Sequence, residues 1–123
     1  MKVAVTAQGA DMNSLLDPRF GRCQYFIIID PDSEEFDAVA NQGVMASGGA
    51  GIQSAQFLAD RGVSAVLTGN VGPNAARALQ GAGIEVYSMA SGTVREAVQA
   101  YKAGNLGRIS GATVGSHFGM GKR

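Results

Sequence analysis

One stretch near the middle of the chain, Gly48–Pro73, constrains the fold more than any other. It reads as a glycine loop, a helix, a buried strand and a second glycine loop. The helix is predicted over residues 51–61, where apolar residues recur at helical spacing and Gly62 follows as a stop. The strand is the short apolar run at residues 65–67, which is typical of a strand covered on both faces. Pro73 then suits the first position of a second helix.

The two glycine loops are expected to meet at one edge of a sheet. A helix that feeds a parallel strand runs back along it, so the N-terminus of the helix lies near the C-terminal end of the strand. The loop at residues 48–51 and the loop at residues 69–72 then share this edge. Ligands of open α/β sheets bind at the C-terminal edge, so the sequence predicts a binding site there.

The other predicted elements give the fold class. Four more strands are indicated by apolar and β-branched runs, at residues 2–7, 24–30, 35–41 and 84–88. A third helix starts at a capping box made by Thr93 and Glu96.

The element order is therefore β-β-β-α-β-α-β-α. The first three strands are expected to form an antiparallel meander, and the last two to join in parallel through right-handed crossovers. The fold class is α/β, with a mixed five-stranded sheet in the order 3-2-1-4-5, flanked by helices. This is the ribonuclease H-like arrangement, in which residues 84–88 form a half-exposed edge strand.

The chain of 123 residues has the length of one domain, with a hydrophobic content of 46% that suits a single core. The domain is expected to span residues 1–104. Residues 105–123 are rich in glycine and lack periodicity, so we expect a flexible tail.

Charge and composition exclude several functions. Lys plus Arg and Asp plus Glu number 10 each, which gives no electrostatic basis for binding nucleic acid or a membrane surface. No apolar run approaches the ~20 residues of a membrane span, and no signal peptide precedes the first strand. We expect a cytoplasmic protein, and its single cysteine rules out an intrachain disulfide.

The segment Leu16–Cys23 follows the first strand and is expected at the same edge as the glycine loops. Arg19 and Arg22 present forked donors that suit carboxylates or phosphates. Cys23 is a ligand type for thiophilic metals, and the adjacent arginines would favour its thiolate. A simpler interpretation is also open: Asp17 and Arg19 form a surface ion pair, and Cys23 is a small apolar residue that enters the second strand.

The glycine loops offer backbone donors. N–H groups at helix N-termini attract anions, so Gly49, Gly51, Asn70 and Gly72 are candidate binding residues. The alternative is that these glycines only make tight turns. The loops lack both the Gly-Lys-Ser/Thr of a P-loop and a complete dinucleotide fingerprint.

The tail carries His117, the only histidine of the chain. It is a candidate metal ligand if the tail folds over the site, and the alternative is a disordered tail.

Enzyme signatures are missing from the sequence. Ribonuclease H-like nucleases need carboxylates on their central strands to hold two divalent metals, and residues 2–7 and 64–68 contain none. The only histidine lies in the tail, so no nucleophile and base can be paired. The sequence therefore predicts binding and no enzymatic activity.

A set of short motifs resembles a known family. The motifs are Arg19-Phe20-Gly21-Arg22, Tyr25-Phe26, Asn41, Gly49-x-Gly51 and Gly69-x-x-Gly72. In this order the chain, from Met1 to about Tyr101, is similar to the dinitrogenase iron–molybdenum cofactor biosynthesis proteins: the NifX and NafY carriers and the C-terminal domain of NifB. The resemblance implies a ribonuclease H-like fold that carries an iron–sulfur or iron–molybdenum-type cluster, or its precursor, and cluster-assembly proteins as partners.

The chain departs from this family at one position. Nitrogenase-associated members have His-Phe-Gly where this chain has Arg19-Phe20-Gly21. The resemblance implies that the histidine ligates the cofactor, a role that arginine cannot fill. It therefore favours cluster binding by a small stand-alone NifX-like member over a role in nitrogen fixation.

The sequence thus predicts a non-enzymatic carrier of a metallocluster, either a monomer or a weak homodimer. The expected cofactor-binding residues are Arg19, Phe20, Gly21, Arg22, Gly49, Gly51, Asn70 and Gly72, and the expected metal ligands are Cys23 and His117. Two rivals stay open: a binder of a small anionic metabolite or nucleotide, and a catalytically inactive ribonuclease H-like interaction module.

Overall fold

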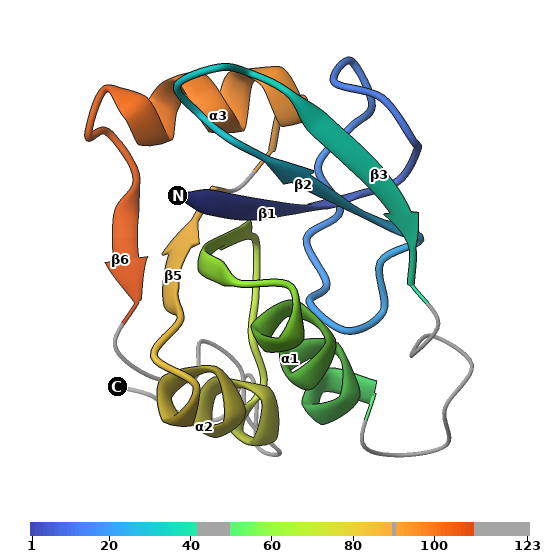
Figure 1. Ribbon diagram of the computed structural model, residues 1–123, viewed down its shortest axis with the longest axis vertical. Helices are drawn as coiled ribbons and strands as arrows, with labels where there is room; N and C mark the ends of the chain where they lie inside the picture. The colour runs from blue at the N-terminus through green and yellow to red at the C-terminus, as the bar shows by residue number, and fades with distance from the viewer. Residues whose placement is uncertain (42–49, 90, 110–123) are drawn as a thin grey trace.

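A mixed six-stranded sheet with helices on both faces forms the centre of the computed structural model (Figure 1). The structure describes residues 1–41, 50–89 and 91–109. The strands are β1 (Lys2–Ala7), β2 (Tyr25–Ile29), β3 (Phe36–Ala40), β4 (Val63–Thr68), β5 (Glu85–Ser88) and β6 (Gly107–Ile109). The helices are α1 (Ala50–Asp60), α2 (Pro73–Gly81) and α3 (Val94–Lys102). Within the described residues, no helix has the length and apolar character that crossing a membrane requires.

The sheet order is β3-β2-β1-β4-β5-β6. The predicted order of the first five strands is therefore confirmed. The strands β1, β2 and β3 form the expected antiparallel meander, and β4 joins β1 in parallel, as β5 joins β4. The name ribonuclease H-like for this arrangement stays a prediction.

The sixth strand corrects two expectations. β6 pairs antiparallel with β5, so the sheet has six strands and β5 is not an edge strand. Residues 107–109 were expected in the flexible tail, but they belong to the sheet. A strand of three residues is too short to show any periodicity in the sequence. It forms because α3 ends beside the open edge of β5 and Ile109 packs against the core. Residues 110–123, which include His117, lie outside the described residues.

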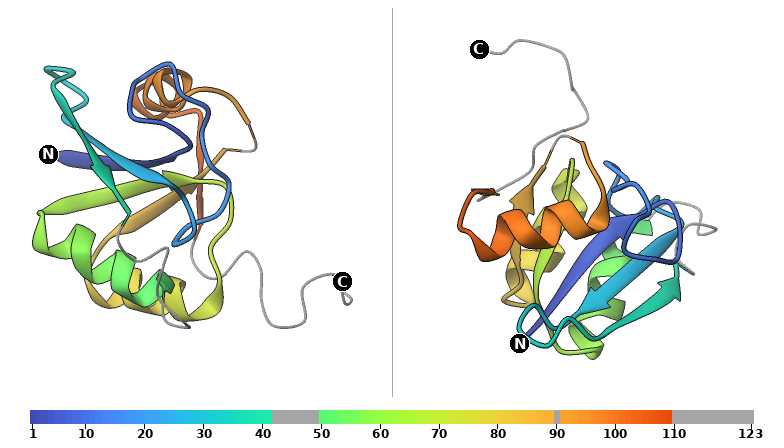
Figure 2. Two further views of the ribbon diagram at one scale, coloured as in Figure 1. Left: turned by 90° about the vertical axis from the view of Figure 1, so that its right-hand side faces the viewer. Right: turned by 90° about the horizontal axis from the view of Figure 1, so that it is seen from above.

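Two apolar cores lie on opposite faces of the sheet. Figure 2 shows α1 and α2 on one face and α3 on the other. Alternate residues of each central strand enter the two cores: in β2, Phe26 and Ile28 face α1 and α2, whereas Ile27 and Ile29 pack with the cluster that contains α3. This explains why the sequences of these strands are continuous apolar runs, because a strand that is covered on both faces buries the side chains on both.

The start of α3 forms as the sequence predicts. The N–H of Glu96 donates to the hydroxyl of Thr93 at 3.1 Å, and the N–H of Thr93 donates to the carboxylate of Glu96 at 2.8 Å. This capping box fixes the point at which the chain turns back across the sheet after β5.

We predict that β6 contributes to stability. A chain that ends at Gly104 lacks the pairing with β5 and the packing of Ile109, so its free energy of unfolding should fall by about 1–3 kcal/mol relative to a chain that ends at Ile109. Urea unfolding of the two truncated chains measures the difference. Equal unfolding midpoints would show that β6 adds nothing.

Candidate functional site

The long connection between β1 and β2 meets the loop after β4 at the C-terminal ends of both strands. Arg19 pairs with Asn70 in a parallel bridge. The N–H of Phe20 donates to the carbonyl of Asn70 at 3.2 Å, and the N–H of Asn70 donates to the carbonyl of Pro18 at 2.7 Å. The structure therefore brings the segment Leu16–Cys23, the arginine segment, together with the second glycine loop at residues 69–72.

Two glycines make this close passage possible. A Cβ atom on Gly69 would lie 2.6 Å from the Cα of Pro18, which no larger residue could tolerate without moving the backbone. Gly21 has a φ of 90°, a conformation that side chains disfavour. The second loop passes within contact of the first because Gly69 has no side chain.

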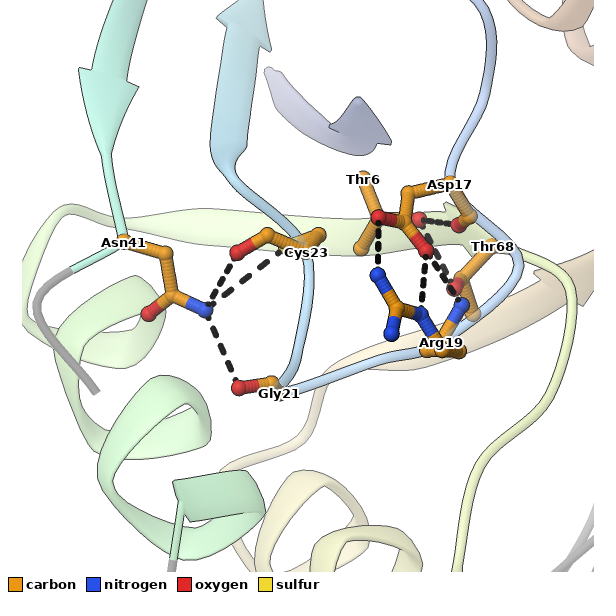
Figure 3. Close-up of polar contacts among 7 residues, drawn as sticks. All are labelled: Thr6, Asp17, Arg19, Gly21, Cys23, Asn41 and Thr68. Carbon is orange, nitrogen blue, oxygen red and sulfur yellow. Dashed lines mark hydrogen bonds and ion pairs between the residues drawn. The ribbon is translucent and has the colours of Figure 1, made fainter. Parts of the chain in front are cut away.

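An ion pair lies at the centre of the arginine segment (Figure 3). The carboxylate of Asp17 accepts from Nε of Arg19 at 3.1 Å, from Nη2 at 3.2 Å and from the main-chain N–H of Arg19 at 3.0 Å. The Asp17 side chain is 1% exposed, whereas the Arg19 side chain is 61% exposed. The hydrogen bond and the charge of Asp17 raise the pKa of Arg19. The simpler sequence interpretation foresaw this pair but placed it at the surface, and its acid is buried.

Two buried threonines hold the start of the segment. The Oγ1 atom of Thr6 lies 2.6 Å from the main-chain oxygen of Asp17 and 2.8 Å from Oγ1 of Thr68. Because a carbonyl can only accept, the Thr6 hydroxyl donates to Asp17 and accepts from Thr68. Thr6 and Thr68 lie near the C-terminal ends of β1 and β4, so the loop is tied to both central strands. Sequence reasoning missed them, although a threonine at the end of each apolar run was a signal.

Asn41 holds the other end of the segment. Its Nδ2 donates to the carbonyls of Gly21 at 3.0 Å and Cys23 at 2.9 Å, and lies 3.8 Å from the Cys23 sulfur (Figure 3). Ser54 of α1 donates to Oδ1 of Asn41 at 3.4 Å. The end of β3, the arginine segment and α1 therefore meet at one buried amide.

Cys23 lies behind the segment and is 0% exposed. Burial, together with the charge of Asp17, raises the pKa of its thiol to about 12. The expectation that neighbouring arginines favour the thiolate is wrong, because burial dominates and the Arg19 charge is already matched by Asp17. That Cys23 is a metal ligand stays a prediction. To bind a metal, the thiol would have to become exposed, which requires the residues that cover it to move.

The other predicted residues occupy different environments. Arg22 is exposed. Phe20 is buried, with its ring centroid 6.0 Å from that of Phe26, and is part of the core. Gly51 packs against α2, where a Cβ atom would lie 2.8 Å from the Cβ of Ala75, so close helix packing explains this glycine.

Gly72 is the N-cap residue of α2, which has Pro73 in its first turn and no side-chain cap. Asn70 is exposed. Gly49 and His117 lie outside the described residues.

N–H donors of the type that bind anions occur in both segments. The exposed Arg19 and Arg22 belong to the segment between β1 and β2, and the N-terminus of α2 follows the loop after β4. Among residues 1–41, 50–89 and 91–109, no three His, Cys, Asp or Glu side chains are placed to hold a metal ion.

A cavity of about 440 Å³ lies elsewhere, near the C-terminal end of α3. Its walls include Tyr87, Tyr101 and Leu106. The one basic side chain in its lining, Lys102, already pairs with Glu34 at 3.5 Å. None of the predicted site residues that the structure describes lines this cavity.

We predict that the Cys23 thiol makes stability depend on alkaline pH. Its folded-state pKa of about 12 lies above the ordinary value of 9.0, so its contribution is complete below pH 9 and is lost as pH rises towards 12. The free energy of unfolding should fall on the order of 1 kcal/mol per pH unit more steeply in the wild type than in Cys23→Ala. Denaturant unfolding between pH 8 and 11 tests this, and parallel curves would contradict it.

We predict that Asn41→Ala destabilises the protein by about 1–3 kcal/mol, because two buried carbonyls lose their donor. The matched control is Asn74→Ala on the exposed surface of α2, which should change stability by less than about 0.5 kcal/mol. Equal urea midpoints for the two variants would exclude a structural role for the amide.

Comparisons with known proteins agree with this fold. The apo form of the orange protein from Desulfovibrio gigas is 42% identical, with a TM-score of 0.88 over 91% of this chain and 95% of that chain. A proposed NifB protein from Thermotoga is 37% identical, with a TM-score of 0.81 over 91% and 96%. An uncharacterized protein of Methanocaldococcus jannaschii is 30% identical over 109 residues, 86% of this chain and 89% of the relative.

The family model described as dinitrogenase iron-molybdenum cofactor matches residues 1–104. This match covers both strands, both loops and the ion pair of the candidate site. The chain belongs to the dinitrogenase iron–molybdenum cofactor family.

Proposed function

We propose that this protein binds a metallocluster as cargo and catalyses no reaction. The cargo is an iron–sulfur or iron–molybdenum-type cluster or its precursor, received from and passed to cluster-assembly proteins. Family membership supports this proposal, as do two relatives, one described as a proposed NifB protein and the other solved as an apo form.

One observation carries the proposal: the arginine segment is locked to Asn70 at the C-terminal edge of the sheet. Ligands of open α/β sheets bind at this edge, and the donors gathered here suit an anion. The bonds to Asn70, Thr6 and Asn41 hold the segment in place before any ligand arrives, which lowers the entropy that binding would cost.

The arginine at position 19 decides how a cluster would be held. A histidine at this position would bind a metal atom directly. Arg19 instead donates two side-chain N–H groups to Asp17, and its side chain is otherwise largely exposed to solvent. The cluster is therefore held through its outer atoms, by hydrogen bonds from Arg19, Arg22 and main-chain N–H groups, and Cys23 lies behind them.

A small anionic metabolite or nucleotide is the second candidate ligand. It is favoured by the same donors, since all of them are N–H groups that would also bind a carboxylate or phosphate. It would need no thiol, which agrees with the burial of Cys23.

Anaerobic reconstitution separates the two candidates. The protein is incubated with ferrous iron, sulfide and a small thiol, desalted, and assayed by visible absorption and by metal content. The small thiol supplies the terminal ligands that the iron atoms need when the protein holds the cluster only by hydrogen bonds. We expect retained metal and absorption in the wild type and in Cys23→Ser, because the thiol is buried. Loss of both in Cys23→Ser, with unchanged far-UV dichroism, would make the thiol a ligand. No retained metal in either protein would favour the metabolite.

We predict that Arg22→Ala lowers the affinity for the reconstituted cluster by about tenfold, because a charged hydrogen bond is lost. The control is Arg61→Ala, which removes the same charge beyond the C-terminal end of α1, where Arg61 stacks on Phe57. Cluster retention on a desalting column, measured against added chelator, gives the comparison. Equal retention by the two variants would remove Arg22 from the site.

A further inference from the structure

The candidate site contains a charge that an anion site does not need. Asp17 places a buried carboxylate directly behind the donors that would face an anionic ligand (Figure 3). No step of cluster binding uses this carboxylate.

Asp17 fixes the direction of the Arg19 guanidinium. Arginine has five N–H donors, and the Nε and Nη2 bonds to Asp17 use two of them, at 3.1 and 3.2 Å. The remaining donors are on the outer part of a side chain that is 61% exposed. Arg19 cannot leave to wrap around a ligand, because a carboxylate that is 1% exposed would then stay buried without its cation.

Asp17 also cancels much of the Arg19 charge. A compact anion roughly 4 Å outside the guanidinium would lie about 8 Å from the carboxylate, so the repulsion would remove about half of the attraction. The loss grows in proportion to the charge of the ligand. Hydrogen bonds from the outward N–H groups depend much less on that charge.

We propose that Asp17 sets the selectivity of this site against compact, multiply charged anions such as phosphate. The favoured ligand has acceptor atoms spread over a larger surface and a low charge per atom. The fixed N–H donors of Arg19 then select it by the positions of its acceptor atoms. This inference rests on the proposed function and narrows it, because a phosphate-bearing metabolite would be disfavoured.

The test is calorimetric titration with inorganic phosphate at pH 7.5 and low ionic strength. We expect the wild type to bind phosphate with a Kd above about 10 mM. Asp17→Asn should bind about five- to tenfold more tightly, because the repulsion is gone. The gain should disappear in Asp17→Asn with Arg19→Gln. A loosened loop would lower the affinity for phosphate, so a gain that requires Arg19 separates selectivity from a merely structural role.

Asp17→Ser is the second variant, because its hydroxyl can still accept from the N–H of Arg19 as Asp17 does. Dichroism and thermal midpoints identify which variants are folded. Submillimolar phosphate binding by the wild type would overturn the proposal whatever the variants do. A folded Asp17 variant without a gain would also overturn it.

The outcome is distinguishable from that of the proposed function. If reconstitution fails but Asp17→Asn gains phosphate, cluster carriage is wrong and the selectivity stands. If the wild type retains the cluster but the Asp17 variants gain nothing, the selectivity is wrong and the carriage stands.

Discussion

The buried carboxylate of Asp17 must be neutralised where it lies, and the architecture of the candidate edge follows from this requirement. A charge removed from water is costly unless it is paired and fully hydrogen bonded, and Asp17 obtains three donors from Arg19 alone. Arg19 lies two residues after Asp17, and at this position its main chain also forms a parallel bridge with Asn70. The bonds of Asp17 to Thr6 and the bridge of Arg19 to Asn70 join the end of β1 to the loop after β4, and the Arg19 side chain stays 61% exposed.

Other buried polar contacts make the edge rigid. The Thr6 and Thr68 hydroxyls hold the first part of the segment, and the Asn41 amide holds its last part. Each of these groups is satisfied within the protein, so opening the segment would expose several donors and acceptors together. A rigid frame of this kind suits a carrier, because the donors are in place before the ligand arrives and need no ordering on binding. The same frame keeps the Cys23 thiol protonated and away from solvent.

Arg19 stands where the sequence resemblance implies a histidine in nitrogenase-associated proteins, and this difference has a physical meaning in the proposed site. A metal-binding imidazole needs a free nitrogen directed at the ligand. Arg19 offers N–H donors instead, and Asp17 would remove about half of the attraction that the Arg19 charge exerts on a compact anion. In the proposed site this position would act as a directional donor in place of a metal ligand. Binding would then depend on the shape of the ligand and on its acceptors, and a carrier would release its cargo without breaking a metal–protein bond.

The order of five strands, the helices and the capping box of α3 could all be predicted from the sequence, because apolar periodicity, glycine stops and Thr93 with Glu96 are local signals. The contact between the arginine segment and the second glycine loop could also be predicted from the sequence, because the chain direction brings the C-terminal ends of β1 and β4 to one edge of the sheet. Other features depend on residues far apart in the chain. The three residues of β6 have no period, and they become a strand only because the edge of β5 is open beside them. Asp17 and Arg19 look the same in sequence whether the acid is at the surface or buried, and only packing under the loop decides between the two. Gly51 is a candidate anion-binding glycine in the sequence. Only the position of α2 shows that a Cβ atom there would lie 2.8 Å from the Cβ of Ala75, so that helix packing requires glycine.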